Sequence, residues 1–581
     1  MDKEQIAAIF EEIALLLEVK GDNPFRIRAY RNAARIILGM DENLAKIIRE
    51  KRLTEYPGIG KDLAEKITIL FTRGRLPFYE KLKRSTPKGL LEMMQIHGLG
   101  GKRVKAIYEK LKIKSVAALK IACQKGKLSK IPGFSSKTES NILASMQHAA
   151  SYQRRHYWYE AMEIAEPILK ALGKLKGVKK ADIAGSLRRK LETIGDLDFL
   201  VGAKNPASIM KWFTSQPFVA RVLGKGETKA SIKLKSGIQA DLRIVPEEEY
   251  GFALAYFTGS KEHNIRMRER ALKRGWSLSE YGLVPKNPRY KTPFAKTDKN
   301  ISEKDIYKAL GLSYIKPELR EDKGEFEAAE KNKLPQLIEE KAIRGTFHNH
   351  TTATDGRSTL REMVQAAQKL KWEYIGIADH SKSSFQAGGL SEEKLLKQIA
   401  EIKRLNASKK FRPYVFSGVE CDILASGSLD YSDDILAKLD YVVISIHNAL
   451  RQDEKKMTRR IIRAIENPYT TMVGHVTGRL LLQREPCKIN LNKVIDACIA
   501  NHKIMELNAN PMRLDMDWRY WHAARDKGLM CCINTDAHHT SHLDFFRLGV
   551  NIARKGWLEE KDVINTRPLK QMQALLKNMR T

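Results

Sequence analysis

Apolar positions follow a different pattern in the first quarter of the chain than in the rest. Residues 1 to about 150 are rich in helix formers and are broken by short glycine turns, whereas strand-like runs such as ADIAG, LDFLV and IQADLRIV begin only after about residue 180. Apolar residues that recur every three or four positions predict helices, and short continuous or alternating apolar runs predict strands. The pattern therefore predicts a helical module that precedes an α/β module.

Charged residues dominate the stretch from Pro317 to Pro335, where KPELREDKGEFEAAEKNKLP shows almost no apolar periodicity. Such a stretch predicts a solvated connector, so we place the main boundary near residue 340. Beyond it, the apolar runs YIGIADH, YVVISIH, TMVGHV, IMELNAN and CCINTDAH alternate with longer helical patterns. This alternation is typical of a barrel-like or wound α/β domain.

Chain length and composition predict a soluble, multidomain protein. At 581 residues the chain is far longer than one hydrophobic core supports, and its 43% hydrophobic and 30% charged residues are an ordinary globular balance. No apolar run is long enough to span a membrane, and the acidic start lacks the features of a secretory signal. The six cysteines form no CxxC pair, so we expect reduced thiols and a cytoplasmic location.

The net charge indicates a polyanionic partner. Lys and Arg total 103 against 69 acidic residues, a formal charge of +34. The basic excess is 13 in residues 1–150, 10 in residues 151–340 and 11 in residues 341–581. Every part of the chain is therefore a candidate for contact with nucleic acid, because each neutralised phosphate releases condensed counterions. A charge that only keeps the protein soluble is the alternative.

Three short turns recur in the helical module, at Tyr56–Lys61, Ile96–Gly101 and Ile131–Ser135. In each, one helix is expected to end and another to begin, which leaves backbone N–H groups free to hold a phosphate without reading a base. The turns resemble helix-hairpin-helix DNA-binding motifs, although the third has Ser135 in place of the second glycine. The predicted phosphate-binding residues are Gly58, Gly60, Lys61, Gly98, Gly100 and Lys102.

Two carboxylates interrupt an apolar strand-like run in IGDLDFLV, residues 194–201. Residues i and i+2 of a strand face the same way, so Asp196 and Asp198 point together and repel unless a cation lies between them. Asp241, in the run IQADLRIV, offers a third carboxylate. Because Mg²⁺ is usually held by few carboxylates plus substrate phosphates, the three aspartates predict a two-metal site. For the DxD pair alone, a solvated strand end is the alternative.

Neighbouring motifs add a candidate triphosphate site. GSLRR, residues 185–189, combines a small turn with two guanidinium groups, and Gly-Ser followed by DxD resembles the nucleotidyltransferase superfamily. The whole series GSLRRKLETIGDLDFLV, ADLRIV and YFTGSKEHNIRMR resembles the palm and thumb of X-family DNA polymerases. NPFRIRAYRNAAR near the N-terminus resembles the DNA-end-binding domain of that family, so the resemblance covers roughly residues 1–317.

The resemblance implies a role for each matching residue. Asp196, Asp198 and Asp241 would be catalytic and would bind two Mg²⁺ ions. The residues in contact with the incoming dNTP would be Ser186, Arg189, Gly195, Tyr256, Phe257, Gly259 and Asn264, and Arg268 would contact the template strand. Lys66 matches the Schiff-base lysine of the family's lyase members, although a phosphate contact is the commoner role for such a lysine.

This chain departs from the family pattern at two of these places. Lys190 stands where a glycine often follows the paired arginines, and Gln239 replaces a basic residue that some members carry two positions before the third aspartate. Neither change removes an expected metal ligand, but Gln239 leaves the acidity of the primer hydroxyl and the rate of nucleotide addition open.

Ten of the 14 histidines follow residue 340, at the ends of apolar runs rather than scattered over helices. Strand ends are where α/β barrels assemble active sites, and mixed imidazoles and carboxylates are ligands of transition metals. FHNHTTATDG, IADHS, GVE, ISIH, GHVTGR and NTDAH resemble the PHP (polymerase and histidinol phosphatase) domain, a metal-dependent phosphoesterase. By that resemblance up to three Mn²⁺ or Zn²⁺ ions would be bound by His348, His350, Asp355, His380, Glu420, His447, His475, Asp536 and His538.

The expected fold is multidomain, α and α/β. We expect a helical, lyase-like DNA-end-binding domain with a helix-hairpin-helix at 1–82 and a second helical DNA-binding subdomain with a helix-hairpin-helix at 83–150. A nucleotidyltransferase-type palm with a mixed sheet would follow at 151–250, and a thumb for nucleotide selection at 251–317. A linker at 318–340 would then lead to a PHP domain, a distorted β/α barrel, at 341–581.

The expected function is template-directed DNA synthesis that fills short gaps in repair, with 3′–5′ exonuclease or related 3′-end processing at the PHP site. AP endonuclease activity is left open. The expected partners are dNTPs and gapped or nicked DNA with a 3′ primer end, with no membrane, and the protein is expected to be a monomer. The alternatives are a nucleotidyltransferase that acts on tRNA or a small molecule, and a catalytically silent DNA-end-binding scaffold.

Overall fold

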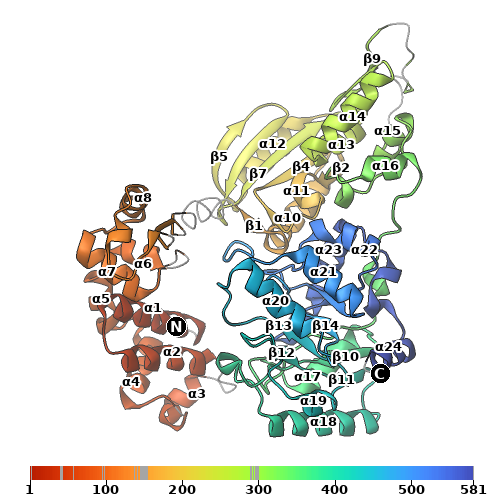
Figure 1. Ribbon diagram of the computed structural model, residues 1–581. Helices are drawn as coiled ribbons and strands as arrows, with labels where there is room; N and C mark the ends of the chain where they lie inside the picture. Colours follow the sequence, from red (N-terminus) through yellow and green to blue (C-terminus); the bar gives the residue numbers. More distant parts are fainter. Residues whose placement is uncertain are drawn as a thin grey trace. The chain divides into compact units, whose positions relative to one another are not determined.

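The chain folds into two units in the computed structural model, residues 1–153 and 154–581, and each is described by itself (Figure 1). The structure describes residues 1, 3–38, 44–56, 58–94, 96, 99–136, 138–140, 142–143, 155–287, 291, 293–294 and 300–579. None of the helices within these ranges is long and apolar enough to cross a membrane. All six cysteines are free thiols.

The first unit is helical, as its sequence pattern predicts. Its described α-helices are α1 (Lys3–Lys20), α2 (Pro24–Leu38), α3 (Leu44–Arg49), α4 (Lys61–Arg73), α5 (Pro77–Arg84), α6 (Lys88–Met94), α7 (Gly101–Leu111) and α8 (Val116–Gln124). One apolar core is built from residues between Ile6 and Leu82, and a second from Val19 and residues between Leu90 and Ile142. Apart from Val19, which packs into the second core, the two sets of core residues fall on either side of residues 83–89.

A mixed five-stranded sheet opens the second unit. Its strands are β2 (Val178–Ile183), β4 (Asp196–Ala203), β5 (Val219–Lys225), β6 (Lys229–Leu234) and β7 (Gln239–Val245), in the order β2-β4-β7-β6-β5. Strands β4 and β7 are parallel and the other pairs are antiparallel. Helices α10 (Trp158–Gly173) and α12 (Pro206–Ser215) supply Leu172 and Phe213 to the core of this sheet, where they join Leu197 and Phe199 of β4.

Small elements connect this sheet to a helical segment. Strands β1 (His156–Tyr157) and β3 (Thr193–Ile194) pair with each other, and the single turn α11 (Gly185–Arg188) lies between β2 and β3. The helical segment consists of α13 (Tyr250–Thr258), α14 (Lys261–Lys273), the strand pair β8 (Trp276–Ser279) and β9 (Gly282–Pro285), α15 (Glu303–Ala309) and α16 (Glu325–Glu330). Phe252, Ile306 and Phe326 lie in its core.

The stretch predicted to be a solvated connector instead forms part of this helical segment and of its core. Arg320 is fully buried and donates to Glu303 at 2.6 Å, and Glu325 is fully buried and hydrogen-bonded to His263 at 2.8 Å. The prediction is wrong for this stretch because the charges that suggested solvation are paired inside the protein. Their partners lie 17 and 62 residues away in the sequence, beyond the reach of a local pattern.

Parallel strands form a closed ring in the last part of the chain. They are β10 (Tyr374–Ile377), β11 (Tyr414–Ser417), β12 (Glu420–Asp422), β13 (Val443–Ser445), β14 (Met472–Val473), β15 (Ile504–Asn508) and β16 (Cys531–Asn534). β10 pairs with β11, β12 to β16 pair in sequence order, and a parallel bridge between His380 and Glu420 links the two sheets. The segment 346–349 closes the ring, because Gly376 N donates to Thr346 O at 2.8 Å and Asn349 forms a parallel bridge with Ala537.

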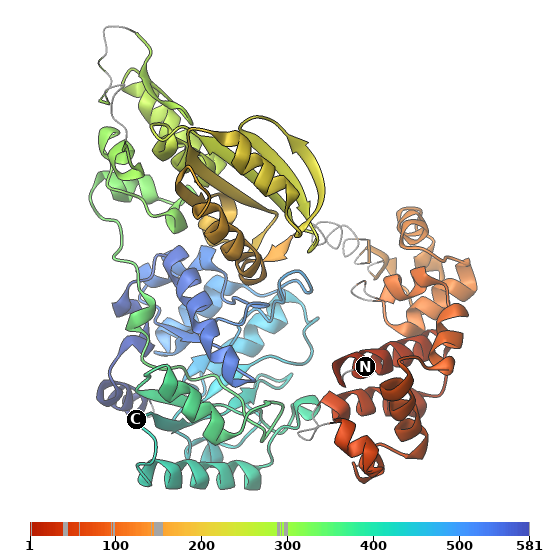
Figure 2. The ribbon, with the colours of Figure 1, turned by 180° about the vertical axis from the view of Figure 1, so that it is seen from behind.

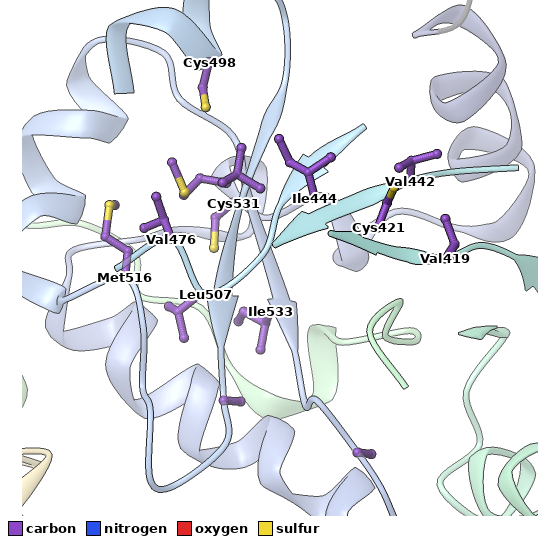
Figure 3. Close-up of a cluster of buried hydrophobic side chains, with 14 of the residues drawn as sticks. Val419, Cys421, Val442, Ile444, Val476, Cys498, Leu507, Met516, Cys531 and Ile533 are labelled. Carbon is purple, nitrogen blue, oxygen red and sulfur yellow. The ribbon is translucent and has the colours of Figure 1, made fainter. Parts of the chain in front are cut away.

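Helices surround this ring, which makes it the predicted distorted β/α barrel. They are α17 (Leu360–Lys369), α18 (Glu392–Ala407), α19 (Asp433–Leu436), α20 (Glu454–Ile465), α21 (Leu491–Ala500), α22 (Trp518–Asp526), α23 (Phe546–Lys555) and α24 (Leu569–Asn578). Figures 1 and 2 show them on the outside of the strands from both directions. The core in Figure 3 gathers Cys421, Ile444, Leu507 and Ile533 from four strands and Cys498 from α21, all of them fully buried. A core packed this tightly holds the strand ends in fixed positions.

Candidate active sites

The three predicted aspartates lie on two neighbouring strands of the mixed sheet. β4 and β7 pair in parallel register with Asp198 opposite Asp241 and Asp196 opposite Gln239. Leu197 is fully buried, whereas the aspartates on either side of it are half-buried. Residues that pair directly across two strands share a face, so the three carboxylates lie on the same side of the sheet.

Burial and mutual repulsion perturb these carboxylates. Burial, followed by the charges of Asp196 and Asp241, raises the pKa of Asp198 to about 7. Lys229 Nζ lies 3.6 Å from Asp241, and Gln239 donates to the same carboxylate at 3.0 Å. In the described part of the chain the trio is not among the groups of three ligand atoms that lie within 4.8 Å of one another. A divalent cation relieves this repulsion, so the oxygen donors fit Mg²⁺.

The backbone of Gly185 approaches one of these carboxylates closely. Its φ of +60° lies in the left-handed region, and a Cβ at this position would lie 2.0 Å from Asp198 Oδ2. Both the backbone conformation and the close approach therefore require glycine here.

The paired arginines of the GSLRR turn differ in their surroundings. Arg188 forms a bidentate pair with Glu303, at 2.6 and 2.9 Å, so this guanidinium is engaged inside the protein. Arg189 donates from Nε to Glu321 at 3.0 Å and from Nη1 to Thr258 O at 2.6 Å. Neither of these two contacts uses Nη2 of Arg189. Of the two guanidinium groups expected at the triphosphate, only Arg189 remains a candidate.

The remaining predicted dNTP contacts lie close to this turn in the chain or along helices α13 and α14. Ser186 belongs to α11, and Gly195 directly precedes β4. Tyr256 and Phe257 lie near the end of α13, with ring centroids 5.2 Å apart and edge to face. Asn264 donates to Tyr256 O at 2.6 Å. Gly259, with a φ of +72°, joins the two helices, and Arg268 is exposed on α14.

All nine predicted histidine, aspartate and glutamate ligands come together in the barrel. Five of them follow the ends of β10, β13, β14 and β16, whereas Glu420 is the first residue of β12. The structure places them in four groups whose ligand atoms lie within 4.8 Å of one another. The groups are His350, Asp355, His380 and His538; His348, Glu420 and His475; His348, His350 and Asp536; and His380, Glu420 and His447. Because four residues belong to two groups each, the groups form one continuous centre.

Buried imidazole nitrogens without hydrogen bonds indicate that this centre suits metal ions. Among the described residues, both ring nitrogens of His350, Nε2 of His348, Nδ1 of His380 and Nδ1 of His475 are buried and make no hydrogen bond of acceptable angle, although carboxylate oxygens lie near several of them. Native proteins seldom leave buried polar atoms unpaired. Burial, with the nearby His538 and His380, lowers the pKa of His350 to about 4, which keeps its imidazole in the neutral, ligating form. The donors fit Mn²⁺ or Zn²⁺.

The Glu420 carboxylate lies close to four of the histidine ligands of this centre. Its oxygens lie 2.8 Å from His475 Nε2, 2.9 Å from His380 Nδ1, 3.2 Å from His447 Nε2 and 3.3 Å from His348 Nε2. Burial by itself raises the pKa of Glu420, but His447, His348 and His380 outweigh burial and hold it well below its usual range. The ionised carboxylate belongs to two of the four groups, so it would be a ligand in either of them when metal is bound.

Two buried carboxylates behind the ligands were missing from the sequence prediction. Glu506, on β15, accepts from His348 Nδ1 at 2.7 Å, and Asp422, on β12, accepts from His447 Nδ1 at 2.7 Å. Each holds an Nδ1 proton and so aims the opposite nitrogen into the centre. The sequence signal for Asp422 is its position two residues after Glu420, and Glu506 lies within the polar-ended run IMELNAN.

Glu506→Gln is expected to weaken metal binding at this centre by about tenfold to a hundredfold, because glutamine no longer fixes His348 as a charged acceptor does. Calorimetric titration of the metal-free protein with Mn²⁺ measures the affinity. Glu466→Gln, a change at an exposed glutamate of the same domain, is the matched control. Equal affinities of Glu506→Gln and the control would show that Glu506 has no orienting role.

The three turns of the helical unit share one hydrogen bond. It runs from Ile59 N to Tyr56 O, from Leu99 N to Ile96 O and from Phe134 N to Ile131 O, at 3.0 Å in each case. Gly60 and Gly100 are the N-caps of α4 and α7, and neither has an atom within 4 Å of the place where a Cβ would stand. In the third turn the Ser135 hydroxyl accepts the capping hydrogen bond, so serine replaces glycine without loss of the turn.

The other predicted phosphate-binding positions are placed only in part. Gly58 has a φ of +103°, and Lys61 is the exposed first residue of α4. Gly98 and the side chain of Lys102 lie outside the described residues. Both helix starts therefore present backbone amides, with Lys61 as the charge beside the first of them.

Lys66 lies in surroundings that favour its charged form. Its ammonium pairs with Asp62 and lies 5.3 Å from the ring centroid of Phe78 and 5.6 Å from that of Tyr30. Burial by itself lowers the pKa of Lys66, but hydrogen bonds to Asp62 and Tyr30 outweigh it and raise the pKa. A Schiff-base lysine must lose its proton, so these contacts count against that chemistry, and the lyase role stays a prediction.

Family models match the chain in four places. A helix-hairpin-helix domain matches residues 1–76, and a SAM-like helix-hairpin-helix tandem matches residues 90–147. The DNA polymerase beta thumb matches residues 253–321, and the PHP domain matches residues 346–510. The two turn-bearing helical regions, the helical segment after the mixed sheet and the metal-binding barrel each correspond to one of these families.

Curated relatives match the whole chain or one end of it. The DNA polymerase/3′-5′ exonuclease PolX of Bacillus subtilis (strain 168) is 37% identical over 580 residues, which cover 99% of this chain and 100% of that protein. DNA polymerase lambda of Rattus norvegicus is 26% identical over 342 residues, 54% of this chain and 55% of that protein. A probable phosphatase of Thermoanaerobacter sp. (strain X514) is 26% identical over 230 residues, 38% of this chain and 89% of that protein.

Proposed function

Because the chain belongs to the X-family DNA polymerases that carry a C-terminal PHP domain, we propose that it fills short gaps in DNA during repair and trims 3′ ends. The mixed sheet, or palm, adds dNTPs to a primer, and the PHP centre acts as a 3′–5′ exonuclease. The observation that carries the proposal is that one folded unit, residues 154–581, holds two chemically different ligand sets. One set is all carboxylate, and the other is rich in imidazole.

At the palm, Asp196, Asp198 and Asp241 would hold two Mg²⁺ ions, which make the primer hydroxyl more acidic and neutralise the leaving phosphate. Arg189 binds the triphosphate through Nη2. Gln239 donates to Asp241 but carries no charge. The chain's own positive charge beside Asp241 therefore comes from Lys229, 3.6 Å away.

The residues around the palm give the incoming dNTP its orientation. Ser186 and Gly195 flank the triphosphate, and Tyr256 and Phe257 close the site on the sugar side. Asn264 meets the minor-groove edge of the incoming base, while Arg268, exposed on α14, contacts the template strand. Groups held in place before the substrate arrives lower the entropic cost of aligning the primer and the dNTP.

At the PHP centre, the nine ligands would hold up to three Mn²⁺ or Zn²⁺ ions, which supply a nucleophile at neutral pH and polarise the scissile phosphate. Glu506 and Asp422 keep His348 and His447 aimed at that centre. Arg513 Nε lies 3.3 Å from Asp536 and places a positive charge beside the ligands, where the negative phosphate would bind.

Dependence on divalent metal follows from the two catalytic families, and candidate metal-binding groups are present. The identity of each ion is our proposal, as are the contact residues of gapped DNA and dNTPs. The domain boundaries, the monomeric state, the cytoplasmic location and any lyase or AP endonuclease activity stay predictions.

Primer extension on DNA with a one-nucleotide or five-nucleotide gap tests the proposed function. With Mg²⁺, the protein should add only the dNTP that pairs with the template base and should fill the gap. Addition that ignores the template, or addition to a tRNA 3′ end instead, would favour the wider nucleotidyltransferase class. A metal-loaded protein inert toward dNTPs and 3′ ends alike would be a DNA-end-binding scaffold.

Gly185→Ala is expected to slow gap filling by about tenfold to a hundredfold. The added methyl group displaces a catalytic carboxylate, and a displacement of about 1 Å in a catalytic group lowers the rate by that much. The added Cβ would lie 2.0 Å from Asp198 Oδ2, so the carboxylate has to move. Single-turnover gap filling measures the rate, and exonuclease activity of the same preparation is the control. An unchanged rate would contradict the close approach of Gly185 to a catalytic carboxylate.

A further inference from the structure

The guanidinium of Arg189 is held in place from two sides. On one side Nη1 donates at 2.6 Å to the carbonyl oxygen of Thr258, the last residue of α13. On the other side Nε donates to Glu321 at 3.0 Å. The side chains of Arg189 and Glu321 are only 12% and 13% exposed, so little water competes for this pair. Glu321 is therefore one of the two groups that fix the direction of the Arg189 guanidinium.

Glu321 is held by a lysine of the PHP domain. Lys555, the last residue of α23, donates to Glu321 Oε1 at 2.6 Å, the same oxygen that accepts from Arg189. Its ammonium also lies 3.2 Å from Arg189 O and 3.3 Å from Glu318 O. One ammonium group thus contacts both the carboxylate that holds Arg189 and the main chain of Arg189 itself.

Burial makes this contact unusual for a lysine. The side chain of Lys555 is 0% exposed, and its ammonium lies 4.5 Å from the ring centroid of Trp518. Lysine is almost never fully buried unless its charge is paired, because desolvation of the ammonium costs several kcal/mol. All three oxygens around this ammonium come from residues that precede the barrel in the chain, Arg189, Glu318 and Glu321.

A second lysine attaches the same turn to the same helix. Lys190, which stands where a glycine often follows the paired arginines, has a φ of +56°. Its ammonium donates to Asn551 of α23 at 2.7 Å and lies 3.3 Å from Glu318. The turn that carries Arg189 is therefore fixed to α23 at two neighbouring points.

We propose that Lys555 of the PHP domain is a positioning residue of the polymerase site, acting through Glu321 to hold the Arg189 guanidinium where the dNTP triphosphate binds. The proposal rests on the proposed function of the palm. It gives the PHP domain a part in synthesis that does not use its metal centre. The consequence is that a change in α23 alters dNTP binding without altering the carboxylates that hold the catalytic metal.

The experiment measures kcat and KM for the dNTP in single-nucleotide gap filling by the full chain. Lys555→Met removes the charge and keeps most of the volume, and it is expected to raise KM about tenfold with kcat changed less than about twofold, as for loss of one charge-assisted hydrogen bond. In an Arg189→Met background the same change should leave KM within about twofold, because residues that act through one contact are not additive. Lys561→Met, at an exposed lysine of the same domain, is the matched control.

Other results would overturn the proposal. It is wrong if Lys555→Met leaves KM unchanged, or if it raises KM equally with and without Arg189. Exonuclease activity and melting temperature report whether the variant is folded. If Lys555→Met does not fold, Glu321→Gln replaces it as the test, and an unchanged KM for that variant is equally contradictory. Failure of the wild-type protein to add a dNTP at all would instead refute the proposed function.

Discussion

Asp198→Asn is expected to lower template-directed gap filling by about a thousandfold or more, since loss of a catalytic metal ligand removes several kcal/mol of transition-state stabilisation. Asp198 pairs across the strands with Asp241 and follows Asp196 on the same face, so no other carboxylate takes its place. Asparagine keeps the size of the side chain and does not crowd Gly185.

Single-turnover incorporation into gapped DNA with saturating Mg²⁺ measures this loss. Glu227→Gln, at an exposed acid of the same sheet region, is the matched control and should retain the wild-type rate. Exonuclease activity of Asp198→Asn should also be retained. A rate within tenfold of wild type would mean that Asp198 is not a metal ligand.

The same variant should be more stable than wild type when no metal is present. Burial and the neighbouring carboxylates raise the pKa of Asp198 from 3.8 to about 7. Between these values the folded chain keeps a proton that the unfolded chain has lost, so the free energy of unfolding falls as the pH rises through this range. Asp198→Asn removes the penalty and should raise the melting temperature of the metal-free protein at pH 8 by about 1 °C for each kcal/mol of relieved repulsion, because the folded unit is as large as residues 154–581.

Thermal unfolding in EDTA at pH 8 and at pH 4 checks this prediction. The difference between variant and wild type should shrink at the lower pH, where Asp198 is protonated in the folded protein. A variant that melts below wild type at pH 8 would contradict the repulsion among the aspartates.

Glu420→Gln is expected to abolish the exonuclease, with a loss of about a thousandfold or more, because it removes a carboxylate that belongs to two of the four ligand groups. Glu420 lies within 3.3 Å of nitrogens from four histidines. The neutral amide that replaces it binds divalent cations more weakly and leaves those imidazoles without their shared anion.

Metal content by atomic emission, measured beside exonuclease activity on a labelled 3′ end, tests the Glu420 prediction. The variant should retain fewer ions per chain than wild type and should still fill gaps. Glu401→Gln, at an exposed glutamate of α18, is the matched control. If the variant keeps its full metal content and full exonuclease activity, Glu420 is not a metal ligand of the PHP centre.

Much of both sites was predictable because their residues are local in sequence or obey a short period. Strand alternation predicts that Asp196 and Asp198 share a face. The ends of apolar runs predict that His380 and His447 lie just after barrel strands, where active sites form. Neither inference needs to know which strands are neighbours. The motifs also carry the family resemblance, and a relative 37% identical over 99% of the chain bears that family out.

The parts that were not predictable depend on contacts between distant segments. Glu506 orients a histidine 158 residues away, and Lys555 approaches Arg189 across 366 residues. Arg188 looks like a phosphate ligand in sequence but pairs with Glu303, 115 residues away. The charges of Arg320 and Glu325 indicated a solvated connector for the same reason. From sequence alone, a charged residue is predicted to be solvated or to bind a ligand, because its buried partner is not visible in the local pattern.

The central claim is that one chain carries two independent metal sites, one that adds nucleotides and one that removes them. A reciprocal pair of variants, assayed on one gapped DNA substrate, tests it most directly. Asp196→Ala with Asp198→Ala should abolish dNTP addition and retain Mn²⁺-dependent removal of the 3′ nucleotide. His348→Ala with His350→Ala should abolish removal and retain addition. If either pair of changes removes both activities while the melting temperature is unchanged, the two-site account is wrong.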